Sequence, residues 1–153
     1  MILTMPSGIE IHNPTQDDIN GLLKLDNSFW NEGCGEASLS RDKPPRLVIH
    51  QDKDYGFVVL DLDSHKALID DKKDRNIIVT LESGGEPFPV SICFFMEYEQ
   101  AKAILLHYIH TEEILNCSQW YDIHDDFDYD SYWESVEYLE GTKIFNKNNL
   151  TRK

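Results

Sequence analysis

Acidic residues in one stretch near the C-terminal end of the chain have the spacing of a calcium-binding loop. Five of them would occupy the ligand positions of a twelve-residue loop: Asp126, Asp128, Asp130, Glu134 and Glu137. Ca²⁺ prefers several hard oxygen ligands, which these side chains offer. Ser131 stands where such a loop needs glycine for its sharp turn, and the bulky Trp133 follows closely. Calcium binding by residues 126–137 is therefore an alternative hypothesis to a solvated acidic segment.

Other residues capable of chemistry do not form a recognisable site in the sequence. His107 and His110 are three apart and could face one metal ion from a helix, but two ligands do not close a zinc site. Cys93 stands between Ile92 and Phe94 in a predicted strand, where a buried thiol is inert. The chain has no phosphate-binding loop, dinucleotide fingerprint or zinc-protease motif. We therefore expect no catalytic activity, metal or cofactor, and an enzyme with an unrecognised site is the alternative.

Composition limits the class of protein further. The 153 residues suit one domain, contain no apolar run long enough to cross a membrane, and carry a net charge of −14. Such acidity argues against nucleic acid or an anionic membrane as the partner, and fits either a merely soluble surface or a basic protein partner. Cys34, Cys93 and Cys117 are odd in number and widely spaced, which favours reduced thiols. With no secretory signal at the N-terminus, we expect a cytoplasmic protein.

The elements that must position these residues are clearest between Ile77 and Ile109. An alternation of apolar residues predicts a strand from Ile77 and another around Val90–Phe94, separated by a turn at Ser83–Pro87. Beyond Glu97 the apolar residues share one helical face: Ala101, Ile104, Leu105, Tyr108 and Ile109. This pattern predicts a hairpin that feeds an amphipathic helix folded back over the sheet. Ile92 and Leu105 are expected to be buried against each other's elements.

The chain before residue 77 predicts a short helix and several strands. Ile9–Ile11 reads as a strand, and Thr15 followed by Asp18 is a loose version of the capping box, before a helix that Gly21 keeps short. Residues 26–45 read as an irregular loop. Strands are expected over Leu47–Ile49, Phe57–Leu62 and Lys66–Ile69, and their short connections imply antiparallel pairing.

These patterns together predict an α+β fold. An antiparallel sheet, a meander of about five to six strands, would be packed by an N-terminal and a central amphipathic helix. We expect one domain over residues 1–141, including an acidic aromatic segment at 121–140, followed by a frayed tail at 142–153.

Several short motifs appear in a fixed order along the chain. They are Asn13-Pro14-Thr15 leading into Asp17-Asp18-Ile19 and Leu22, the strand Gly56-Phe57-Val58-Val59-Leu60, the turn Ser83-Gly84-Gly85-Glu86-Pro87, the helix start Glu97-Tyr98-Glu99-Gln100-Ala101, and Trp120. In order and spacing the chain resembles the immunity protein 1 family of bacterial polymorphic toxin and contact-dependent inhibition systems. The segment after Trp120 lies outside that pattern.

The resemblance implies a small cytoplasmic α+β protein that has no enzymatic activity. It would bind and neutralise a cognate toxin C-terminal domain, basic and acting on nucleic acid as a deaminase or nuclease. The acidity of this chain fits such a partner, because an acidic inhibitor is steered toward a basic substrate groove.

The segment Tyr121–Glu140 is the predicted contact surface for the toxin. It combines eight acids with six aromatic residues and has no lysine or arginine. Aromatic anchors supply much of the energy of protein interfaces, and acids would pair with toxin lysines and arginines. The predicted toxin-binding residues are Asp122, Asp125, Asp126, Asp128, Tyr129, Asp130, Tyr132, Trp133 and Glu134. In the alternative reading, Phe127, Trp133 and Tyr138 pack onto the sheet and only the acids face water.

Overall fold

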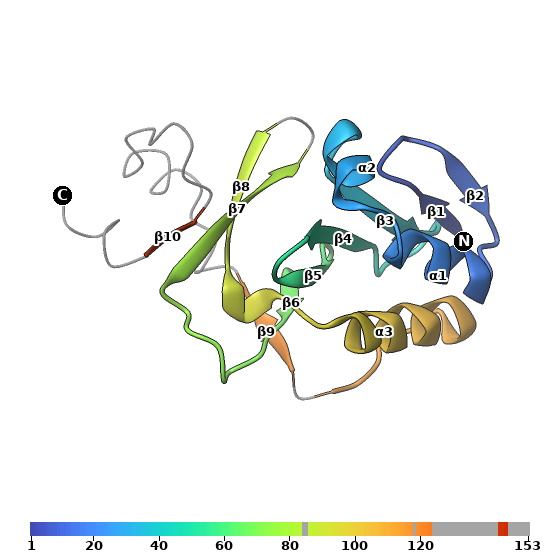
Figure 1. Ribbon diagram of the computed structural model, residues 1–153. Helices are drawn as coiled ribbons and strands as arrows, with labels where there is room; N and C mark the ends of the chain where they lie inside the picture. Colours follow the sequence, from blue (N-terminus) through green and yellow to red (C-terminus); the bar gives the residue numbers. More distant parts are fainter. Residues whose placement is uncertain (84–85, 118, 124–143, 147–153) are drawn as a thin grey trace.

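The computed structural model describes residues 1–83, 86–117, 119–123 and 144–146. Its elements in chain order are β1 (Ile2–Thr4), β2 (Glu10–His12), α1 (Gln16–Leu23), α2 (Asn27–Glu32), β3 (Glu36–Ser40), β4 (Leu47–Asp52), β5 (Gly56–Asp61), β6 (Lys66–Leu68), β7 (Ile77–Ser83), β8 (Glu86–Ser91), the 3₁₀ turn η1 (Ile92–Phe94), α3 (Tyr98–Thr111), β9 (Trp120–Asp122) and β10 (Ile144–Asn146) (Figure 1). The predicted α+β class with antiparallel strands is confirmed.

The described strands form two antiparallel sheets. The larger sheet has seven strands in the order β2-β1-β3-β4-β5-β6-β9, and the smaller has three in the order β10-β7-β8. The described strands differ from the expected meander of five to six strands in two ways. Strands β1, β3 and β9 of the large sheet were not predicted, and the hairpin β7–β8 belongs to the smaller sheet. Residues 144–146, inside the segment expected to fray, pair with β7 as β10.

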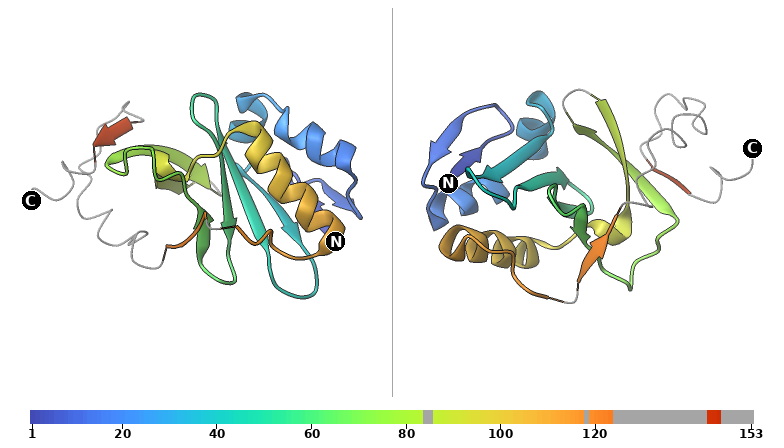
Figure 2. Two further views of the ribbon diagram at one scale, coloured as in Figure 1. Left: turned by 90° about the horizontal axis from the view of Figure 1, so that it is seen from below. Right: turned by 180° about the vertical axis from the view of Figure 1, so that it is seen from behind.

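The large sheet is covered on both faces. Along β4 and β5, Leu47, Ile49, Phe57 and Val59 pack into a core with α1, α2 and α3, whereas Val48, Val58 and Leu60 pack into a second core with the small sheet and η1. Figure 2 shows the helices and the hairpin on different sides of these strands. Burial on both faces explains why β5 is a continuous apolar run and not an alternating one.

The chain changes sides of the sheet between η1 and α3. Phe95 lies in the second core and its neighbour Met96 lies in the first. Met96 N donates to Phe57 O at 2.6 Å, and Phe57 N donates to Met96 O at 2.9 Å, so this crossing is bonded to the start of β5. Gly56, at φ +104°, leaves room for it, since a Cβ there would stand 2.3 Å from the Met96 carbonyl oxygen.

This crossing makes one expectation wrong. Helix α3 does cover a sheet, as expected, but it packs on α1 and on β5 of the large sheet and not on the hairpin that precedes it. Leu105 is fully buried in the first core, whereas Ile92 is half-buried at the margin of the second. The two residues therefore do not pack against each other's elements. The periodicity showed that both elements are apolar, but not which face of the sheet each one covers.

The interpretation of residues 26–45 as irregular loop is also wrong, because α2 and β3 lie there. Helix α2 has no side-chain cap and is held by Trp30, which is fully buried and meets the Phe57 ring edge-on at 6.5 Å. Ala37 and Leu39 of β3 are buried in the first core. These elements depend on tertiary burial, so local sequence signals are weak there.

The hairpin boundaries also differ from expectation. Strand β8 ends at Ser91, and residues Ile92–Phe94 form a 3₁₀ turn, so Cys93 is not in a strand. Ser91 Oγ accepts the Cys93 N–H at 3.4 Å and itself donates to Arg75 O at 2.8 Å, which diverts the backbone from the sheet ladder. The expected burial of Cys93 is confirmed.

Pro87 and Pro89 lie within β8 and not in the turn. Proline donates no hydrogen bond, so it is tolerated on an outer strand. There it also discourages pairing with another chain.

Helix α1 is the element that the sequence specified best. Asp18 Oδ2 accepts the Thr15 N–H at 2.7 Å, and Thr15 Oγ1 accepts the Asp18 N–H at 3.4 Å, as the capping box predicts. The hydrogen bonds from Thr15 lower the pKa of the Asp18 carboxyl, because they favour its charged form. The helix ends after eight residues and buries Ile19, Leu22 and Leu23.

Candidate functional site

Most of the predicted toxin-binding segment lies outside the described residues. Asp125, Asp126, Asp128, Tyr129, Asp130, Tyr132, Trp133 and Glu134 fall there, as do the whole candidate calcium loop and the aromatics Phe127 and Tyr138. Asp122 is the predicted contact residue that the structure places. It is exposed on β9 at the edge of the large sheet, opposite Lys66 of β6.

The start of that segment is anchored on the second core. The Tyr121 ring is half-buried and lies 6.1 Å from the Phe94 ring, and the Arg75 guanidinium stands 4.9 Å over its face. Trp120 beside it donates from Nε1 to Leu115 O at 2.9 Å and packs against the first core. At β9, therefore, the aromatic side chains face the body of the protein and Asp122 faces solvent.

The histidine pair on α3 is not assembled into a metal centre. His107 is half-buried, and His110 Nδ1 lies 2.6 Å from the Leu106 carbonyl oxygen, which occupies that ring nitrogen. Across the part of the chain that the structure describes, no group of three or more His, Cys, Asp or Glu side chains is placed to hold a metal ion. Within the same residues, no helix has the length and apolarity to span a bilayer.

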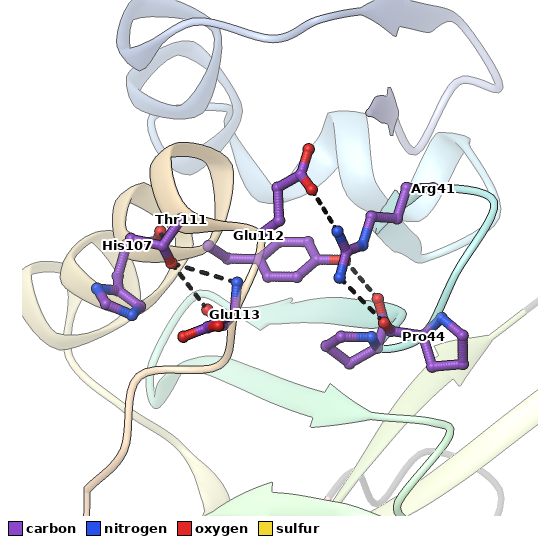
Figure 3. Close-up of polar contacts among 8 residues, drawn as sticks. Arg41, Pro44, His107, Thr111, Glu112 and Glu113 are labelled. Carbon is purple, nitrogen blue, oxygen red and sulfur yellow. Dashed lines mark hydrogen bonds and ion pairs between the residues drawn. The ribbon is translucent and has the colours of Figure 1, made fainter.

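A dense polar cluster joins the loop after β3 to the C-terminal end of α3 (Figure 3). The Arg41 guanidinium pairs with the Glu112 carboxylate and donates to Pro44 O at 3.1 Å, while the Tyr108 hydroxyl donates to Pro45 O. Glu112 ends the helix in the left-handed region at φ 61°. Beside it, Thr111 Oγ1 donates to the His107 carbonyl at 2.8 Å and accepts the Glu113 N–H at 3.2 Å.

The contacts of this cluster give it a structural role. Burial raises the pKa of the Tyr108 hydroxyl, and the positive charge of Arg41 opposes that rise less strongly. The phenol is thus neutral at physiological pH and serves as a donor, not as a nucleophile. Arg41 Nη2 and the Tyr108 hydroxyl donate to backbone carbonyls of one loop, and Arg41 Nη1 pairs with Glu112, so these contacts hold that loop against α3.

A second buried polar group lies between the two sheets. His50 of β4 is 2% exposed, and its Nδ1 lies 3.2 Å from Gly35 O. Since a carbonyl only accepts, Nδ1 carries the proton and Nε2 is the acceptor of the neutral ring. Burial lowers the pKa of His50, and the charge of Glu36, opposite it on β3, raises it by less. A neutral buried imidazole is the consequence.

Large apolar side chains are exposed at one end of the large sheet, and the sequence did not indicate them. Phe29 of α2 is 57% exposed and Ile9, in the turn between β1 and β2, is 64% exposed. Leu62, after β5, is the third exposed large apolar residue among those described, at 37%. Phe29 lies in the segment that was predicted to be loop, and Ile9 lies in a predicted strand. The outward position of either side chain could therefore not be assigned without the tertiary structure.

No family model matches the chain, and no curated protein or solved structure matches it significantly either. The resemblance to the immunity protein 1 family therefore stays a prediction based on the quoted motifs.

Proposed function

We propose that this chain is a cytoplasmic immunity protein. It binds and neutralises a cognate bacterial toxin domain that acts on nucleic acid, by protein–protein contact and without catalysis of its own. The order of motifs from Ile9 to Trp120 supports the family, and the acidic surface supports the kind of partner.

The observation that carries the proposal is charge. The chain has 28 acidic and 14 basic residues, and Asp61 is the buried one among the carboxylates whose burial the structure describes. Its oxygens accept hydrogen bonds from Asp63 N at 3.1 Å and from the Ser64 hydroxyl, which closes the turn after β5. The other acids whose burial the structure describes are exposed or half-buried and produce a negative potential outside the molecule.

A negative surface suits a toxin whose own substrate is negative. Nucleic-acid enzymes carry a basic groove for the phosphate backbone, and an acidic protein is attracted to the same groove. Such attraction speeds association at low ionic strength and suppresses partners of like charge. An inhibitor that occupies the groove would also exclude the nucleic acid.

Expression in bacteria tests the proposal directly. The toxin domain encoded next to this chain should arrest growth when expressed alone, and co-expression of this chain should restore growth. The purified pair should also elute as one complex. Arrest that persists despite a folded, abundant chain would overturn the proposed function.

A further inference from the structure

The first forty residues form an acidic end of the molecule. They contain six acidic residues and one lysine, Lys24, and no arginine; the acids are Glu10, Asp17, Asp18, Asp26, Glu32 and Glu36. These residues fold into β1, β2, α1, α2 and β3, which lie together at one end in Figures 1 and 2. Glu10, Asp17, Asp26 and Glu32 are exposed.

The exposed apolar residues Phe29 and Ile9 lie on this acidic end. The turn that holds Ile9 is bonded to the chain just after α2, since Cys34 N donates to Pro6 O at 2.9 Å. A Cβ at Gly33, the C-cap of α2, would stand 2.1 Å from the same oxygen, so the turn touches the backbone at the C-terminal end of α2. Phe29 and Ile9 thus belong to neighbouring segments of one surface.

Buried contacts beneath this surface hold its backbone in place. Next to Phe29, Trp30 is fully buried against Phe57, and Gly35 N donates to Trp30 O at 3.0 Å. A Cβ at Gly35 would stand 2.0 Å from Glu82 O, so the chain after α2 rests on β7. A large apolar group held in place before binding loses little conformational entropy on association.

We infer that α2 and the β1–β2 turn form a docking surface for a basic protein, with Phe29 and Ile9 as apolar anchors and Glu10, Asp26 and Glu32 as the charged rim. The inference rests on the proposed function in taking the toxin domain as that protein. Protein interfaces place apolar and aromatic anchors at the centre and charged residues around them. A rim with this sign complements lysine and arginine, which favours a basic partner over a second copy of this acidic chain.

Truncation of the anchors tests the surface. Affinity for the purified toxin domain encoded beside this chain is measured by calorimetry for wild type, Phe29→Ser, Ile9→Ser and the double variant. Phe29→Ser should weaken binding by about tenfold or more, and the double variant further. Leu62→Ser is the matched control, because Leu62 is exposed elsewhere on the fold, and it should bind as wild type does. Circular dichroism and thermal unfolding verify that each variant is folded.

Neutralisation of the rim provides an independent measurement. Glu10→Gln with Glu32→Gln should slow association and flatten its dependence on salt. Glu99→Gln with Glu113→Gln removes the same charge from α3 and from the chain just after its C-cap, and should have a smaller effect.

The outcomes separate the surface from the function. Wild-type affinity in the folded Phe29 and Ile9 variants would overturn the docking surface while leaving the toxin proposal in place. Failure of wild type to bind the toxin domain would overturn both. Self-association of wild type that Phe29→Ser abolishes would identify a second copy as the occupant and overturn the assignment to a basic partner.

Discussion

At the scale of single residues, the two cores should respond unequally to truncation. Leu105 is fully buried in the first core, so Leu105→Ala should lower the free energy of unfolding by about 2–5 kcal/mol. Ile92 is half-buried, so Ile92→Ala should cost less than about 2 kcal/mol. Urea denaturation followed by fluorescence measures both. Equal losses for the two variants would contradict the assignment of these residues to different cores.

His50 should make stability depend on pH. Burial holds its folded-state pKa below the ordinary value of 6.5, so on acidification the unfolded chain binds the proton first. The stabilisation is complete above pH 6.5 and is lost as pH falls from there toward the folded-state pKa. Glu36, across the strand pair, opposes this effect and makes the loss smaller.

The measurement compares wild type with His50→Gln. The free energy of unfolding should fall more for wild type than for the variant between about pH 7.5 and about pH 5.5. All other titrating groups are common to the two proteins, so the difference reports the buried imidazole. Parallel curves over this range would show that His50 titrates alike in the folded and unfolded chains.

At the scale of elements, glycines in two places should give opposite results. Gly35 has φ +80° and its added Cβ would stand 2.0 Å from Glu82 O, so Gly35→Ala should lower stability by on the order of 2–4 kcal/mol. Gly21 lies in α1 with no atom within 4 Å of an added Cβ, so Gly21→Ala should raise stability by roughly 0.5–1 kcal/mol. Thermal unfolding distinguishes the two, and a stabilised Gly35→Ala protein would contradict the close approach of β3 and β7.

A comparison of the helices α1 and α2 shows why some elements could be predicted from the sequence and others could not. The α1 helix begins at a capping box whose partners are three residues apart, so its start is written in local sequence. The α2 helix depends on Trp30 reaching Phe57, twenty-seven positions further along the chain. Local patterns cannot specify a helix whose stability comes from a distant contact.

At the scale of the whole molecule, the acidic segment after Trp120 should contribute to association with the toxin domain. Replacing Asp126, Asp128 and Asp130 together with asparagine removes three negative charges, so association should slow and its salt dependence should flatten. Stopped-flow mixing at several salt concentrations measures both quantities. Unchanged rates and salt slope in the folded variant would mean that this segment is not the binding face.

The same variant separates the two candidate surfaces. If the C-terminal acids and the α2 surface both contact the toxin, substitutions in either set should weaken association.

Calorimetry with millimolar calcium addresses the alternative role of the segment. Heat of binding in wild type that the triple variant abolishes would support a calcium loop at residues 126–137.

The sequence by itself determined the composition-dependent properties and the local elements: acidity, the apolar strands β4 to β7, the capped helix α1 and the apolar face of α3. Each of these follows from residues that are neighbours along the chain or share one helical or strand period. The tertiary structure decided which face of the sheet each element covers, the crossing at Met96 that parts Ile92 from Leu105, and the outward position of Phe29 on α2. Those features depend on contacts between residues far apart in sequence, where burial and not propensity selects the conformation.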